Sequence, residues 1–161
     1  MTTAIPRPAP RRTRLGALIA ALALGAAFAP GALAGGATVT RGDFHAFNGS
    51  DLPIAGHATM VRTADGRTIV TIHVEGLGAG VTYGSHVHLK ACDDALAGVH
   101  YRFNPGGDAV PPNEIWPGPF TANSAGIGNA GTIAEGTAGE SAVSVVIHGP
   151  TGPKIACADL G

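Results

Sequence analysis

Residues 55–75 decide the fold class, and they read AGHATMVRTADGRTIVTIHVE. In the second half of this stretch, Val70, Ile72 and Val74 alternate with the residues between them. Such a period of two is typical of a strand with one buried face. The dipeptide Asp65-Gly66 before it favours a tight hairpin turn. We therefore expect two antiparallel strands, Ala55–Arg62 and Arg67–Glu75.

Short β-prone segments of the same kind recur along the chain, separated by Gly, Pro, Asn and Asp. This spacing is typical of a sandwich or barrel. We expect further strands near Thr38–Phe47, Val81–His88, Phe120–Asn123, Ile127–Ala134, Ser141–His148 and Lys154–Ala158. The prediction is an all-β, antiparallel sandwich of about eight strands. A long Gly/Pro-rich stretch from Leu89 to Pro119 is expected to be an ordered functional loop, because structureless loops of that length are uncommon.

The N-terminal segment has the composition of a secretory signal peptide. Four arginines precede an apolar run from Leu15 to Ala29, and Ala32-Leu33-Ala34 supplies a small-x-small cleavage pattern. A transmembrane helix is the alternative, but the run falls short of the roughly 20 apolar residues that span a bilayer. We expect residues 1–34 to be a signal peptide, residues 35–161 to be one β domain, and the protein to be exported, periplasmic or secreted.

Charge and cysteine content narrow the class of protein further. Without the four arginines of the signal segment, six basic residues remain against eleven acidic ones, so the domain carries a net charge near −5. This balance gives no reason to expect nucleic acid or an anionic membrane as a partner. Two cysteines, Cys92 and Cys157, are present. In an oxidising compartment they are expected to pair, with two free buried thiols as the alternative.

The chain contains seven histidines, and they are distributed unevenly along it. His86 and His88 are two apart in a strand-like segment, so their side chains lie on one face. His148 ends another strand, on the face opposite Val143, Val145 and Ile147, and His100 lies in the long loop. Imidazole suits copper, zinc, iron and nickel, and a tetragonal site of nitrogen ligands favours copper(II). Ordinary surface histidines are the alternative, and this is the interpretation preferred for His45, His57 and His73.

The order of these parts resembles the copper/zinc superoxide dismutase family. His86-Val87-His88, Cys92, Gly98-Val99-His100 and Asn104-Pro105 resemble its metal loop. Val145-Val146-Ile147-His148 and Ile155-Ala156-Cys157 resemble its last copper ligand and second disulfide cysteine. The resemblance runs from about Gly56 to the C-terminus. It implies a Greek-key β sandwich.

Carried over residue by residue, the resemblance implies a copper site and a disulfide. His86, His88 and His148 would bind copper, and His100 would be the ligand that bridges copper and zinc in typical members. Cys92 and Cys157 would form the disulfide that ties the metal loop to the barrel.

This chain departs from the family's pattern at the zinc site and at the guiding cation. No histidine occurs between Tyr101 and Ile147, and Asp108 and Glu114 with His100 make a poor tetrahedral zinc site. Lys154 stands in the place of a guiding arginine, after a connection of only five residues, 149–153. The pattern is closest to copper-only members, so copper is expected and zinc is not. Trp116 is expected to pack the long loop onto the sandwich rather than to form an aromatic wall beside the metal.

Three functions follow as hypotheses. The first is an exported, copper-dependent superoxide dismutase that cycles copper(II) and copper(I), with His100 as proton donor and Lys154 attracting superoxide. The second is an extracytoplasmic copper-binding or storage domain of the same fold without catalysis. The third is a structural β sandwich with incidental histidines. The oligomeric state is left open.

Overall fold

The computed structural model describes Met1 and residues 35–161 of the chain. The predicted signal peptide, residues 1–34, therefore lies outside the described residues apart from Met1. Within the described part, no helix is long and apolar enough to cross a membrane.

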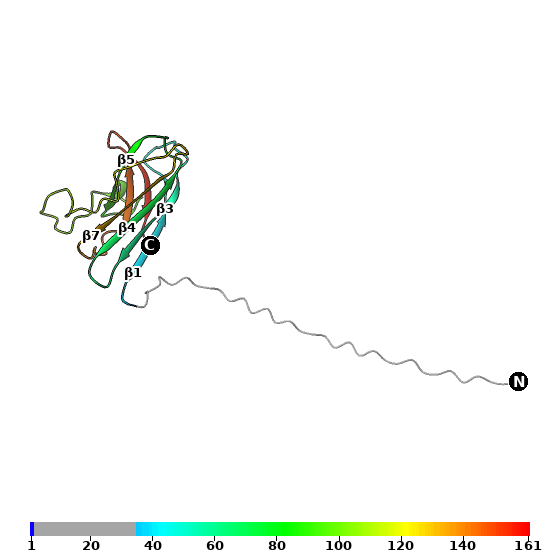
Figure 1. Ribbon diagram of the computed structural model, residues 1–161, viewed down its shortest axis with the longest axis horizontal. Helices are drawn as coiled ribbons and strands as arrows, with labels where there is room; N and C mark the ends of the chain where they lie inside the picture. Colours follow the sequence, from blue (N-terminus) through cyan, green and yellow to red (C-terminus); the bar gives the residue numbers. More distant parts are fainter. Residues whose placement is uncertain (2–34) are drawn as a thin grey trace.

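Two antiparallel sheets pack face to face, which confirms the all-β sandwich (Figure 1). The first sheet has the order β1 (Thr38–Asp43), β3 (Ala55–Arg62), β4 (Thr68–Glu75), β7 (Gly128–Ala134). The second has the order β2 (His45–Ala46), β9 (Lys154–Asp159), β8 (Ser144–His148), β5 (Thr82–His88), β6 (Phe120–Thr121). Because β4 pairs with β7 and β5 pairs with β8, the chain crosses between sheets as Greek-key connections do.

The β3–β4 hairpin forms around Asp65-Gly66 as the sequence predicts. The pairing runs from Ala55 opposite Glu75 to Arg62 opposite Thr68. Gly66 has a φ of 88°, a left-handed conformation that glycine adopts at little steric cost.

One predicted strand, Thr38–Phe47, is divided between the two sheets. β1 pairs with β3, whereas β2 pairs with β9. The buried ring of Phe44 lies between them in the core, where the chain turns from one sheet to the other. A single strand was expected because residues 38–47 contain no proline and only one glycine, Gly42, which alone does not mark a corner.

The core between the sheets is built from the inward residues of every major strand, including Met60, Val70, Val74, Val87, Val145 and Ile147. A second, smaller apolar cluster lies on the outer face of the β5–β8–β9 sheet. It contains Phe47, Cys92, Ala97, Val146 and Cys157. The segment after β5 therefore packs against the outside of this sheet.

The long connection from Leu89 to Pro119 is held to β5 by backbone hydrogen bonds. Tyr101 N donates to Val87 O at 2.8 Å, and Val87 N donates to Ile115 O at 3.0 Å. The rest of the connection extends beyond the strands as the yellow-green segment in Figure 1. This connection brings residues 98–102 and 114–116 beside β5.

Candidate metal centre

Strands β5 and β8 place three of the predicted ligands on one face. His86 lies opposite Val146 and His148 lies opposite Gly84, so both histidines project away from the core that Val87 and Val145 fill. His88 is on the same face and is fully buried, because the connection after β5 covers it. The sequence prediction of a shared outer face is thus confirmed.

The connection after β5 adds the fourth histidine. The backbone bonds of Tyr101 to Val87 and of Leu89 to Val99 fix the path on either side of His100. Its ring centroid lies 4.0 Å from that of His86 and 4.8 Å from that of His88. One nitrogen from each of His86, His88, His100 and His148 lies within 4.8 Å of the others, so the four could hold a metal ion.

In His88, His100 and His148, the ring nitrogen Nδ1 already lies within hydrogen-bond distance of an oxygen. His88 Nδ1 lies 3.3 Å from Gly98 O, and His148 Nδ1 lies 3.1 Å from Gly152 O. Metal-binding histidines commonly donate their other N–H to a carbonyl or a carboxylate in this way. If these Nδ1 atoms carry the protons, each Nε2 presents a lone pair to the cluster. The Nε2 atoms of His88 and His148 are 3.3 Å apart.

His86 supplies the fourth nitrogen in the opposite orientation. Its Nδ1 is buried and has no hydrogen-bond partner. A buried polar atom without a partner costs free energy that a bound ligand would recover. Together, one Nδ1 and three Nε2 atoms form a set of four nitrogen donors that fits a transition metal ion.

The environment favours the neutral form of His86, His88 and His148, which is the form that binds metal. Burial, reinforced by the neighbouring histidines, lowers the pKa of His86 to about 3. Burial also lowers the pKa of His88 to about 3, and the charges of His100 and Lys154 act in the same direction. The pKa of His148 is lowered as well, chiefly by burial.

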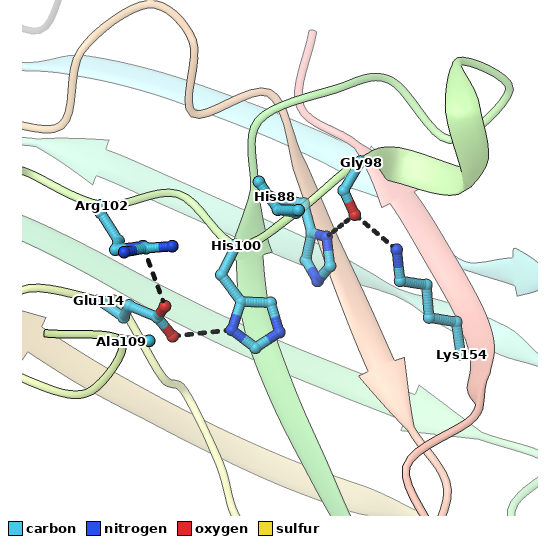
Figure 2. A pocket seen from close by; sticks show the side chains of 8 residues that line it. His88, Gly98, His100, Arg102, Ala109, Glu114 and Lys154 are labelled. Atoms are coloured by element: carbon cyan, nitrogen blue, oxygen red, sulfur yellow. Dashed lines mark hydrogen bonds and ion pairs between the residues drawn. The ribbon is translucent and has the colours of Figure 1, made fainter. Parts of the chain in front are cut away.

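Glu114 supports His100 from the side away from the cluster (Figure 2). Its side chain is only 2% exposed, and its Oε2 lies 2.7 Å from His100 Nδ1. Trp116 Nε1 donates to the same oxygen at 2.8 Å, and Arg102 Nε lies 3.6 Å from Oε1. The carboxylate therefore has partners on both oxygens and fixes the orientation of the His100 ring.

Trp116 occupies a different place from the one the sequence suggested. Its ring lies edge-on to His86, with ring centroids 4.9 Å apart, so it forms an aromatic wall of the centre. The adjacent Ile115 packs the connection into the core instead. The expectation for Trp116 was wrong, because the strand-like alternation of residues 114–116 turns the isoleucine inward and the indole outward.

Lys154 lies at the rim of the centre and is bound to the connection after β5. Its Nζ donates to Leu96 O at 2.5 Å and to Gly98 O at 2.6 Å. Gly98 O is also the oxygen beside His88 Nδ1, so one carbonyl joins the lysine to a candidate ligand (Figure 2). Burial lowers the pKa of Lys154. The lysine thus has a structural contact that sequence reasoning did not foresee.

The predicted disulfide is present and lies behind the centre. Cys92 and Cys157 are bonded, with their Cα atoms 5.9 Å apart. They join the connection after β5 to β9, and Cys92 N donates to Asp159 Oδ1 at 2.7 Å. The cross-link holds the start of that connection against the sheet that carries His86, His88 and His148.

His100 lines three openings, and two of these are also lined by other histidines of the group. One is lined by Lys154 and Arg102 together with His88 and Glu114. The other is lined by uncharged residues, among them Thr82, Pro119 and Gly149. The first presents the cationic side chains of Lys154 and Arg102 beside His88 and His100, and the third opening is lined by His100 and Arg102.

The remaining predicted candidates lie elsewhere. His45, His57 and His73 do not join the four-histidine group, and Asp108 is exposed on the connection after β5. Sequence reasoning considered Glu114 only as a possible zinc ligand and did not identify Arg102. No local signal marks Glu114 as buried, since glutamate is rarely buried unless it is paired, and its partners His100, Arg102 and Trp116 depend on the path of the connection.

No known protein-family model matches this chain, and no curated protein is detectably similar to it in sequence. The assignment of the centre therefore depends on its geometry and on the order of its residues along the chain.

Proposed function

We propose that this protein is an exported, copper-dependent superoxide dismutase that works without zinc and is similar to copper-only members of the copper/zinc superoxide dismutase family. The observation that carries the proposal is the donor set: the orphaned, buried Nδ1 of His86 among three histidines whose Nδ1 atoms are engaged. The disulfide is consistent with an oxidising, extracytoplasmic location.

Copper is the metal that this set suits best. Four imidazole nitrogens without a thiolate or carboxylate ligand favour copper(II), which also stands highest in the affinity order of divalent first-row metals. The carboxylate of Glu114 lies at His100 Nδ1, where a bridging histidine would need a free nitrogen for zinc. This contact supports a centre with copper alone.

Bound copper would supply one-electron oxidation of one superoxide and one-electron reduction of a second. The balanced reaction consumes two superoxide ions and two protons and yields one dioxygen and one hydrogen peroxide. His100 would leave the metal on reduction, take up a proton at Nε2 and deliver it to the product, because its Nδ1 is held by Glu114. The carboxylate at 2.7 Å would stabilise the imidazolium that forms when Nε2 takes up the next proton.

Lys154 and Arg102 would draw the anion toward the centre. The domain as a whole is acidic, so attraction of superoxide needs a local positive field. Both cations line the same opening beside His88 and His100. Each is already hydrogen-bonded to backbone carbonyls, which fixes its position and leaves its charge in place.

The test is superoxide dismutation by residues 35–161 reconstituted with copper alone. We expect turnover without zinc, loss of turnover in His148→Ala, and full turnover in His45→Ala, which removes an exposed histidine outside the centre. His100→Ala should lose turnover while the fold is retained. Turnover that persists in His148→Ala would contradict the proposed centre.

A second candidate function is copper binding or storage without useful catalysis. The observation that favours it is that the Lys154 ammonium makes two short bonds to Leu96 O and Gly98 O, which reduces its freedom to meet an anion. Tight copper binding that is lost in His148→Ala, with no superoxide turnover in the wild-type protein, would decide for this function.

A further inference from the structure

Strands β1, β3, β4 and β7 align four polar side chains in a row across the outer face of their sheet. In the register of the sheet, Asp43 lies opposite His57, His57 opposite His73, and His73 opposite Asn129. Directly opposite residues of antiparallel strands project on the same face. Because Ala58, Val74 and Phe44 fill the core beside them, this row faces away from the core. It lies on the sheet that does not carry the four-histidine centre.

The two histidines of this row are close enough to share a ligand. Their ring centroids are 5.6 Å apart and their planes are inclined by 37°. Neither side chain belongs to the buried core, and that of His73 is 34% exposed. If the two rings rotate toward one another, this spacing leaves room for a metal ion between them. The ion would then lie about 2 Å from one nitrogen of each ring.

Both ring nitrogens of His73 have an oxygen partner from the protein, one an amide and the other a carboxylate. His73 Nδ1 lies 2.8 Å from Asn129 Oδ1, which can only accept, so Nδ1 carries a proton. An amide oxygen in this place fixes the tautomer in the same way as the carbonyls beside metal-binding histidines do. His73 Nε2 is directed to Glu75 Oε1 at 3.0 Å. A cation at Nε2 would therefore have a carboxylate beside it.

We propose that His57, His73 and Glu75 form a second copper(II)-binding site, exposed on the outer face of the β1–β3–β4–β7 sheet, with Asp43 beside His57. Two imidazoles and a carboxylate make a mixed nitrogen and oxygen set, which suits tetragonal copper(II). The site does not depend on the proposed dismutase function, since none of its residues belongs to the four-histidine group and its strands form the other sheet.

The contact that copper would replace at this site, the ion pair between His73 and Glu75, is weak. The His73–Glu75 ion pair is solvent-exposed, with 34% and 51% of the two side chains accessible, and such pairs stabilise a fold only slightly. Replacing the proton between Nε2 and the carboxylate by copper(II) keeps both groups bound to a cation. Because His57 and His73 belong to adjacent strands, the metal would also cross-link β3 to β4.

The experiment is a titration of the metal-free protein with copper(II), followed by calorimetry and by electron paramagnetic resonance. We expect two equivalents, the second weaker and with hyperfine coupling to two nitrogens rather than four. The double variant His57→Ala/His73→Ala should bind one equivalent. Asn129→Ala should weaken the second equivalent by about tenfold, because the tautomer is no longer fixed.

The controls separate this site from the first. His45→Ala, which removes an exposed histidine outside the row, should still bind two equivalents. His148→Ala should lose the four-nitrogen signal and keep the two-nitrogen signal. Circular dichroism of each variant confirms that the sheet is intact. One equivalent in the wild-type protein, or a second equivalent that survives in His57→Ala/His73→Ala, would overturn the proposal.

Discussion

Glu114 is the residue of the candidate centre on which the orientation of His100 depends most directly. It is buried, and one of its oxygens receives both His100 and Trp116. We predict that Glu114→Gln lowers copper affinity or superoxide turnover by about 10- to 100-fold, as loss of such supporting contacts usually does. The amide keeps the size of the side chain but loses the negative charge that lies 2.7 Å from His100 Nδ1. Copper affinity and turnover of the purified variant measure the effect.

The matched control for this substitution is Asp108→Asn. Asp108 is an acid of the same connection that is exposed and does not join the histidine group, so its loss of charge should leave both properties unchanged. Equal effects of the two variants would show that Glu114 acts only through general electrostatics.

The four candidate ligands could be predicted from the sequence, whereas their supporting residues could not. His86 and His88 are related by the period of a strand, and His148 by alternation with Val145 and Ile147. Glu114 and Trp116 reach the centre through a connection without regular periodicity. Their contacts depend on the bonds of that connection to Val87, which no local pattern specifies.

Strands were predictable where alternation and turn residues coincide. β4 and β5 match their predicted ranges to within one residue at each end. The register of the β3–β4 hairpin pairs His57 with His73. A two-residue Asp65-Gly66 turn, counted outward, would place His57 opposite Val74 instead, whereas the three-residue loop between Thr63 and Arg67 shifts the pairing by one residue. The division of residues 38–47 into β1 and β2 was missed, because the corner at Phe44 is set by packing between sheets.

The contact between β9 and the connection after β5 gives Lys154 two separable roles, one as a hydrogen-bond donor and one as a charge. We predict that Lys154→Gln keeps copper affinity, since an amide can still donate to Leu96 O or Gly98 O. Superoxide turnover should fall by roughly tenfold or more, with a weaker dependence on ionic strength, because the steering charge is lost. Rates measured over a series of salt concentrations test this.

Lys90→Gln provides the comparison for that charge. Lys90 lies on the same connection, but it is exposed and pairs with Asp94 at 3.0 Å. Its removal should change turnover little. If Lys154→Gln instead loses copper while its salt dependence is unchanged, the lysine acts only by positioning Gly98 O beside His88.

The stability of the whole metal-free molecule should depend on pH through its buried imidazoles. The pKa values of His86 and His88 are about 3 in the folded protein, well below the ordinary value of 6.5. Below pH 6.5 the unfolded chain therefore binds more protons than the folded chain. The stability that these neutral histidines contribute is therefore complete above pH 6.5. Below that pH, the free energy of unfolding falls as the solution is acidified, by about 1.4 kcal/mol per pH unit for each such histidine.

Urea denaturation of the metal-free protein between about pH 7 and pH 5 measures this slope, in a window where histidines titrate and carboxylates largely do not. His88→Gln should give a shallower slope, whatever its stability at pH 7, whereas exposed His45→Gln should leave the slope unchanged. Comparing slopes removes the cost of altering a packed side chain, which is independent of pH. Identical slopes in His88→Gln and the wild type would mean that His88 is not held neutral by burial.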